Sequence, residues 1–151
     1  MNVGKLCTRD VSIILSTAPV IEAARRMRNE HVGDLVVVRK GGNGGVTPIG
    51  ILTDRDIVVM LVARGAEMID SLVVGDLLTR SLVVAHENED SLVVARRMRE
   101  NGVRRLPVLD EDDRLVGIVT VDDLIGSVNA DLDEIAHLVC GQARQEAERR
   151  P

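Results

Sequence analysis

The segment Ala24-Arg25-Arg26-Met27-Arg28 recurs in the same order, in the second half of the chain, as Ala95-Arg96-Arg97-Met98-Arg99. A second segment, Gly50-Ile51-Leu52-Thr53, recurs there as Gly117-Ile118-Val119-Thr120. The two copies of the second segment are separated by fewer residues than the two copies of the first segment. The first copy of the unit therefore contains a short insertion between its two segments. It falls in the glycine-rich loop at residues 41–45, where an insertion costs little loop-closure entropy. Such repetition predicts that the chain contains two copies of one structural unit.

Each copy is predicted to fold as strand, helix, strand, strand, helix. In the first helix the apolar residues Val20, Ala23 and Met27 share one face, which is typical of an amphipathic helix. The stretch from Ser16 to Pro19 offers this helix a hydroxyl cap and an early proline. The predicted strands are residues 11–15, 35–38, 49–52, 81–85, 105–109 and 115–119. Four helices are predicted: the first ends near residue 31, the second covers residues 54–64, the third covers residues 90–101, and the fourth begins at residue 121.

The two repeats are assigned to residues 3–66 and 72–128. A small sheet of this kind has an apolar face that one copy cannot cover alone, so the two copies are predicted to pack sheet to sheet about a pseudo-two-fold axis. The predicted fold class is therefore a mixed α+β or α/β module of two pseudo-symmetric β-α-β-β-α repeats.

Residues 129–151 are assigned to a helical extension, with a helix predicted over residues 130–149. Leu132, Ile135, Ala136, Val139 and Ala143 stand at helical spacing, and a charged end follows at residues 144–150. The favoured interpretation is a helix that covers the module or forms a dimer interface. The alternative is a helix on which a partner protein docks.

The amino-acid composition argues against a nucleic-acid partner. The chain has no Phe, Tyr or Trp, so it offers no aromatic face on which a base could stack. Its net charge of −5 is also opposite to that of a typical phosphate-backbone binder. Any bound ring must therefore be held by aliphatic side chains and backbone.

Cysteine usage and hydropathy predict a cytoplasmic protein that does not enter a membrane. Cys7 and Cys140 lie far apart and have no neighbours at metal-ligand spacing, so reduced thiols without a metal are expected. No segment resembles a signal peptide, and no apolar run approaches the roughly 20 residues of a membrane-spanning helix.

The pattern Gly-apolar-apolar-Thr-x-x-Asp occurs once in each copy and is the most informative short motif. It places Thr53 and Asp56, and again Thr120 and Asp123, where a strand ends and a helix begins. A carboxylate there can accept two hydrogen bonds from a vicinal diol such as a ribose. The alternative is that the threonine caps the helix and the aspartate favours its dipole. The residues alone leave both possibilities open.

These motifs, together with Val103-Arg104-Arg105-Leu106-Pro107-Val108 and Leu52-Thr53-Asp54-Arg55-Asp56-Ile57, resemble a tandem pair of CBS (cystathionine β-synthase) domains, a Bateman module of the stand-alone bacterial type. The resemblance covers about residues 3–128. It implies an adenine nucleotide such as AMP, ADP or ATP in the clefts between the repeats, and a homodimer. It also implies that Asp56 and Asp123 contact ribose, with Thr53 and Thr120 near phosphate.

The resemblance further implies that Arg104 and Arg105 face phosphate in the cleft of Thr53 and Asp56. The corresponding residues of the first copy are Gly33 and Asp34, so a carboxylate would lie near phosphate in the other cleft. Arg55 is a candidate to compensate this charge across the interface. We therefore expect unequal occupancy, with tighter binding in the cleft of Asp56.

The sequence thus predicts a non-catalytic regulatory module with no required cofactor and an adenine nucleotide as its regulatory ligand. The three histidines, His31, His86 and His137, have no nucleophilic partner at motif spacing, which argues against an enzyme. The alternative function is a structural or stress-related dimer with empty clefts that works by protein interaction. The identity of an unknown protein partner is not encoded in a recognisable motif.

Overall fold

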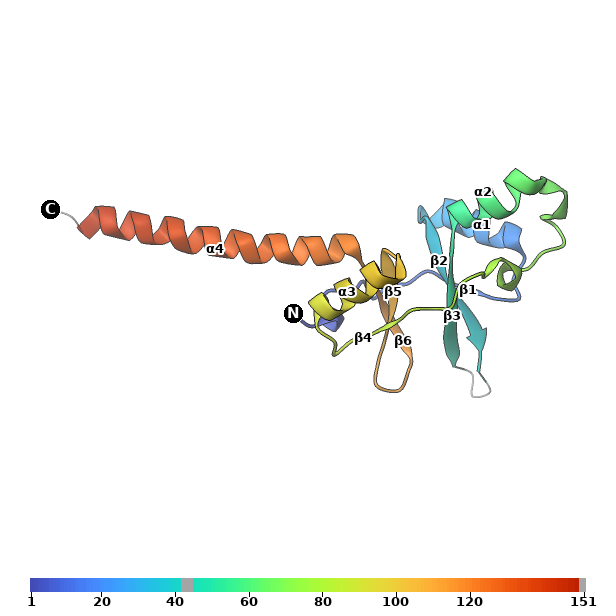
Figure 1. The fold of residues 1–151 in the computed structure, drawn as a ribbon, viewed down its shortest axis with the longest axis horizontal. Helices are drawn as coiled ribbons and strands as arrows, with labels where there is room; N and C mark the ends of the chain where they lie inside the picture. The colour runs from blue at the N-terminus through green and yellow to red at the C-terminus, as the bar shows by residue number, and fades with distance from the viewer. Residues whose placement is uncertain (42–44, 150–151) are drawn as a thin grey trace.

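The computed structural model describes residues 1–41 and 45–149, with side chains for all of these except residues 64, 66 and 140–149. The fold consists of two similar halves followed by a long projecting helix, as Figure 1 shows. The predicted features at Cys140, Ala143 and the charged end at 144–150 lie outside the described side chains.

The first half contains a three-stranded sheet and two helices. Its strands are β1 (Ile13–Leu15), β2 (Asp34–Lys40) and β3 (Val46–Thr53), and its helices are α1 (Val20–Glu30) and α2 (Asp54–Met60). The strand order is β1-β2-β3, with β1 parallel and β3 antiparallel to β2.

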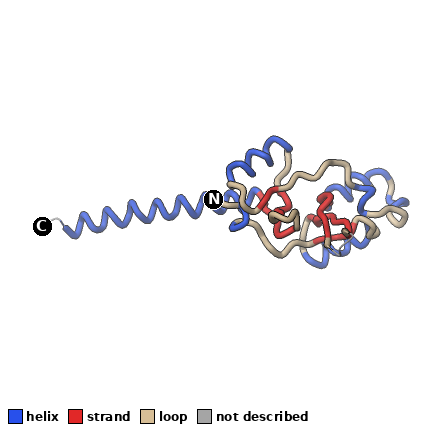
Figure 2. Tube along the Cα trace, turned by 90° about the horizontal axis from the view of Figure 1, so that it is seen from below, coloured by secondary structure: helices blue, strands red, loops and turns tan. Residues whose placement is uncertain are grey.

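The second half repeats this arrangement. Its strands are β4 (Ala85–His86), β5 (Arg105–Leu109) and β6 (Leu115–Thr120), its first helix is α3 (Ser91–Asn101), and α4 (Val121–Arg149) follows β6 directly. The order β4-β5-β6 and the strand directions match those of the first sheet. The two sheets meet at β3 and β6, and Figure 2 shows the strands grouped in the middle with helices outside them. The predicted mixed fold of two β-α-β-β-α repeats is thus confirmed.

Several predicted element boundaries were wrong. Helix α1 has no side-chain cap, because Pro19 takes the N-cap position and its side chain cannot accept a hydrogen bond. The backbone carbonyls of Ser16 and Ala18, just before it, pair with a later segment of the chain. Helix α2 ends at Met60, earlier than predicted, and a 3₁₀ turn over Val62–Arg64 follows. The first strand of the second half starts only at Ala85, since the carbonyl of Val84 accepts a hydrogen bond from the Arg97 side chain (2.7 Å).

The predicted C-terminal helix over residues 130–149 is not a separate element. Helix α4 runs for 29 residues without a break, because Gly126 and Asn129 both keep helical backbone. At 1.5 Å per residue it is about 43 Å long. Its later part projects away from the two halves (Figure 1), and Leu132 and Ile135 are each 58% exposed. The interpretation that this helix covers the module is therefore wrong.

Each half completes its core with the segment that precedes the other half in the chain. Val3, in a 3₁₀ turn at residues 3–5, is fully buried in the second core, whereas Val74, in a turn at residues 74–77, is fully buried in the first. The backbone bonds are equivalent as well. The amide of Gly4 donates to the carbonyl of Glu87 (2.8 Å), and that of Gly75 donates to the carbonyl of Ser16 (2.8 Å), so that equivalent positions of the two repeats make the same bond.

The cores are built from aliphatic side chains, as the composition requires. The first core lies between the first sheet and α1, α2 and residues 74–77. The second core lies between the sheet of β4, β5 and β6 and both α3 and the N-terminal turn. The core side chains with at most 2% exposure include Ile14, Val20, Leu35, Val37, Leu52 and Val74 in the first half and Val3, Val94, Met98, Leu106, Val108 and Val119 in the second.

Candidate functional site

Thr53 and Asp56 form a reciprocal pair of hydrogen bonds where β3 meets α2. The hydroxyl oxygen of Thr53 accepts from the amide of Asp56 (3.1 Å), and Oδ2 of Asp56 accepts from the amide of Thr53 (3.0 Å). This is a capping box, which satisfies two backbone amides at the helix start. The capping role left open by the sequence is therefore real. It engages Oδ2 of Asp56, and no bond to Oδ1 is found within the described residues.

Thr120 and Asp123 repeat the geometry where β6 meets α4. Oδ2 of Asp123 accepts from both the amide and the hydroxyl of Thr120, each at 2.7 Å, and the amide of Asp123 donates to that hydroxyl oxygen (3.3 Å). Both aspartates are partly exposed. The two halves thus present equivalent Thr-Asp pairs, each with a second carboxylate oxygen left over from capping.

Asp34 and Arg105 form an ion pair that joins the two halves. Asp34 is the register partner of Thr53 in the first sheet, and Arg105 is the register partner of Thr120 in the second. Asp34 is the better shielded of the two, with 14% of its side chain exposed against 37% for Arg105. Arg105 therefore reaches the first half beside the threonine of the first Thr-Asp pair.

Arg55 was expected to compensate the charge of Asp34, but this pairing is not observed. Arg105 instead forms the ion pair with the Asp34 carboxylate. Arg55 is exposed at the start of α2, where its amide donates to Oδ1 of Asp54 (2.7 Å). Arg104 is also exposed, and within the described part of the chain neither Arg104 nor Arg55 has a carboxylate at ion-pair distance. The sequence contained a signal for the observed pair, since opposite charges stand at equivalent positions of the two repeats.

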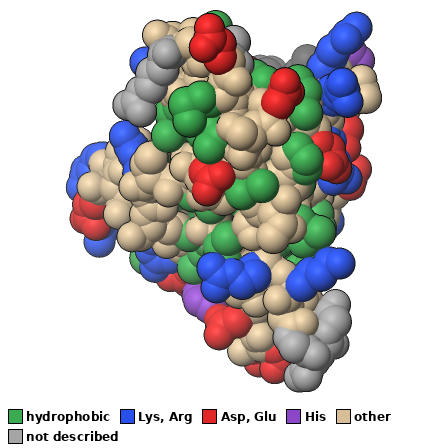
Figure 3. Space-filling model, turned by 90° about the vertical axis from the view of Figure 1, so that its right-hand side faces the viewer, with side chains coloured by type: hydrophobic (Ala, Val, Ile, Leu, Met, Phe, Trp, Pro, Cys, Tyr) green, Lys and Arg blue, Asp and Glu red, His purple; other side chains and the backbone are tan. Residues whose placement is uncertain are grey.

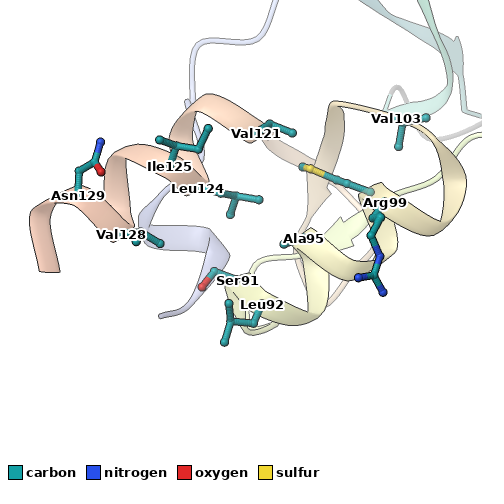
Figure 4. Close-up of a pocket in the computed structure, with 11 residues that line it drawn as sticks. Ser91, Leu92, Ala95, Arg99, Val103, Val121, Leu124, Ile125, Val128 and Asn129 are labelled. Carbon is teal, nitrogen blue, oxygen red and sulfur yellow. The ribbon is translucent and has the colours of Figure 1, made fainter. Parts of the chain in front are cut away.

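Two cavities among the described residues lie between helices, and each is lined by a direct chain neighbour of a Thr-Asp pair, Val121 in one and Asp54 in the other. One, of about 410 Å³, lies between α3 and α4 (Figure 4), and another, of about 330 Å³, lies between α1 and α2. Neither is lined by Thr53, Asp56, Thr120 or Asp123. Figure 3 views the end of the molecule formed by the first half, where hydrophobic side chains are exposed among charged ones. The exposed apolar side chains of this half include Val58, Val59, Val62 and Met68.

A second ion pair stabilises the second half locally. Arg97 donates to Oε2 of Glu89 (2.8 Å) and to the carbonyl of Val84, while Glu89 also accepts from the amide of His86 (2.7 Å). The hydrogen bonds from Arg97 lower the pKa of the Glu89 carboxyl below its usual range. Burial raises the pKa of the Cys7 thiol, so that it packs as a small neutral side chain.

Among the described residues, no cluster of three or more His, Cys, Asp or Glu side chains is arranged to hold a metal ion. The same part of the chain contains no helix with the length and apolar character needed to span a membrane.

A family model, a curated relative and a solved structure all match this chain to the same family. Residues 3–63 and 74–130 match the CBS domain. The CBS domain-containing protein YhcV of Bacillus subtilis is 32% identical over 123 residues, which cover 82% of both chains. The CBS domain pair of protein MJ0100, solved in complex with 5′-methylthioadenosine and S-adenosyl-L-methionine, is 25% identical with a TM-score of 0.70, over 87% of this chain and 98% of that one.

Other relatives are longer than this chain. MK0525 of Methanopyrus kandleri is 31% identical over 125 residues, covering 83% of this chain and 61% of that protein. For MJ1225 of Methanocaldococcus jannaschii the match covers 48% of the relative. The repeated sequence, the paired sheets and these matches together show that the chain belongs to the CBS domain family and contains a tandem pair of these domains.

Proposed function

We propose that the chain is a non-catalytic regulatory module that binds an adenosine-containing ligand, with AMP, ADP or ATP as the leading candidates. The observation that supports this most is the pair of equivalent Thr-Asp motifs, in which Asp56 and Asp123 each keep one carboxylate oxygen outside the capping bonds. A ribose diol would donate to that oxygen. The ligands of the MJ0100 domain pair belong to the same chemical class.

Arg105 and Arg104 would supply the positive charge for a phosphate in the cleft of Thr53 and Asp56. Arg105 already lies beside the first half through its ion pair with Asp34. A phosphate bound there would compete with Asp34 for the guanidinium. Ligand binding would then change a contact between the repeats, and only such a difference between states allows a ligand to shift a conformational equilibrium.

The unequal occupancy expected from the sequence remains part of this proposal. Gly33 and Asp34 stand where the second repeat has Arg104 and Arg105, so the cleft of Thr120 and Asp123 receives less positive charge. We propose that the cleft of Asp56 binds a phosphorylated ligand more tightly. The module would act as a cytoplasmic homodimer, with its signal read by a protein partner.

The proposal is tested by titrating the purified chain with AMP, ADP, ATP, S-adenosylmethionine and 5′-methylthioadenosine in calorimetry. Asp56→Asn should weaken binding of the active ligand at least about tenfold, since it removes the charged acceptor for the ribose. Asp123→Asn should have a smaller effect on the tighter site. Asp76→Asn is a matched control, because Oδ2 of Asp76 accepts from the amide of Val73 (3.0 Å) in the same local geometry but outside the two Thr-Asp motifs.

Three results would contradict the proposal. If none of the five ligands binds, the alternative of a protein-interaction module with empty clefts is favoured. If Asp76→Asn weakens binding as much as Asp56→Asn, the effect reflects stability instead of contact. Equal affinities at the two clefts would remove the expected asymmetry.

A further inference from the structure

Helix α4 has a line of exposed apolar side chains along one face. Ile125, Val128, Leu132, Ile135 and Val139 are separated alternately by three and four residues. Each has between 51% and 63% of its surface exposed, although all five are large and aliphatic. We call these five residues the α4 stripe. The CBS domain match ends at residue 130, so much of the stripe lies beyond the family's own segment.

The spacing of the α4 stripe indicates what kind of surface covers it. Alternation of three and four residues is the seven-residue repeat that brings two helices together along a shared seam. Val121 extends the same pattern by one step toward the sheet. A stripe that packed on its own module would be buried, whereas this one is not. The fitting partner is therefore another helix with the same repeat.

A groove at the base of α4 continues this surface. The cavity of about 410 Å³ between α3 and α4 is lined on the α4 side by Val121, Leu124, Ile125 and Val128 (Figure 4). On the α3 side Leu92 is 69% exposed. The first half of the stripe thus forms one wall of an open groove in its own module, and the second half projects beyond it.

The stripe is complementary to itself when two copies run in opposite directions. If the helices cross near residue 130, Val121 faces Val139 of the other helix, Ile125 faces Ile135, and Val128 faces Leu132. In this register every apolar residue meets an apolar residue, and the projecting half of each stripe lies over the groove of the other copy. No residue of the stripe is left uncovered.

The charges on α4 favour the same direction. Five carboxylates occur in residues 121–134, at 122, 123, 131, 133 and 134, without any Lys or Arg. In a parallel pair, each acidic group would lie beside the same acidic group of the other chain, and the two would repel. Antiparallel helices instead place residues 122–123 opposite 137–138 and residues 133–134 opposite 126–127, segments that contain no carboxylate. Antiparallel helix dipoles also attract each other.

We propose that two copies of this chain dimerise through α4 as an antiparallel helix pair, with each projecting stripe seated in the α3–α4 groove of the other copy. This proposal provides a surface for the homodimer in the proposed function and rests on that part of it alone. Ligand binding at the Thr-Asp pairs does not enter the argument, so either proposal can fail without the other.

The test uses sedimentation of the full chain over a range of concentrations. The wild-type chain should be a dimer, and Leu132→Asp should raise the dimer dissociation constant about a hundredfold or more by placing two charges in the seam. Ala130→Asp is the matched control, because it adds the same charge two residues away on a different face of α4 and should leave the dimer intact. Circular dichroism checks that both variants keep their helix content.

Helix direction is tested by disulfide formation in a background with Cys140→Ser. Mixed Ile125→Cys and Ile135→Cys chains should cross-link to each other, and neither variant should cross-link efficiently with itself. A monomeric wild-type chain, or a dimer that survives Leu132→Asp, would overturn the proposed interface and leave a different protein as the occupant of the stripe. Efficient self-linking of Ile125→Cys would overturn the antiparallel direction.

Discussion

Asp34 and Arg105 occupy the same position in the two repeats, each at the start of a central strand, and form an ion pair with each other. Two equivalent residues of a pseudo-symmetric structure can touch only close to its pseudo-two-fold axis. The axis therefore passes between a carboxylate and a guanidinium. Had both copies kept the same charged residue there, like charges would oppose each other at the junction of the halves.

The coupling between Asp34 and Arg105 can be measured with a double-mutant cycle. Asp34→Asn and Arg105→Gln should each destabilise the chain, and the two effects should fall short of additivity by about 1 kcal/mol, because the pair is only partly shielded from water. Urea denaturation of the four proteins gives the free energies of unfolding. Full additivity would show that the two side chains do not interact in solution.

The same pair allows phosphate recognition to be separated from adenosine recognition. Asp34→Asn frees Arg105, so AMP should bind several-fold more tightly to this variant than to the wild-type chain. The affinity for 5′-methylthioadenosine, which has no phosphate, should stay unchanged. Calorimetry with both ligands distinguishes these outcomes. A parallel change for the two ligands would argue against any competition for the guanidinium.

Gly117 and Gly50 should respond unequally to substitution by alanine. A Cβ at Gly117 would lie 2.6 Å from Sγ of Cys7 and 3.0 Å from the backbone oxygen of Thr8, which is held against β6. A Cβ at Gly50 would meet only the flexible end of the Leu78 side chain, at 2.6 Å. We expect Gly117→Ala to cost about 1–3 kcal/mol and Gly50→Ala clearly less. Equal losses in thermal unfolding would contradict this difference.

Glu89 should contribute to stability in a pH-dependent way. Its pKa is lowered in the folded state by the hydrogen bonds from Arg97, so the folded protein favours the ionised form more than the unfolded chain does. The contribution is therefore complete above the unfolded pKa, about 4.3, and is lost as the pH falls through the lower folded value. Glu89→Gln should destabilise at pH 7 by roughly 1–2 kcal/mol and by less at pH 3.

Urea denaturation at both pH values provides the measurement for Glu89. Glu87→Gln is a suitable control, because Glu87 contacts Arg9 at the longer distance of 3.3 Å and has 37% of its side chain exposed against 21% for Glu89. It should show a smaller loss at pH 7. If the deficit of Glu89→Gln is the same at pH 3 and pH 7, the charge of Glu89 does not account for its effect.

The sequence was most informative where local and repeated patterns coincide. Strand β5, whose apolar residues follow Arg104 and Arg105 without a break, was predicted with the bounds that the structure shows, Arg105–Leu109. The Thr-Asp motifs lie at strand-to-helix junctions as expected. Their proposed contacts with a ligand stay predictions.

Features that depend on distant segments were missed. The hydroxyls before α1 were expected to cap it, yet the backbone there pairs with residues 74–75. The residues around Ser16 contain no pattern that predicts pairing with a segment so far along the chain. The predicted division of helix α4 near residue 129 followed the end of the family resemblance at about residue 128. The helix instead continues through Gly126 and Asn129, although both are weak helix formers. Propensity differences of this size are small against the packing of a long amphipathic helix.

The reciprocal placement of Val3 and Val74 means that the halves are interlocked and do not simply sit side by side. A single repeat expressed alone would retain its own leading turn but lack the one that fills its core. Two such single repeats could satisfy each other by trading turns, as the halves do within one chain. The duplication that produced this molecule can thus be understood as the fusion of an obligate, segment-swapped dimer into one polypeptide.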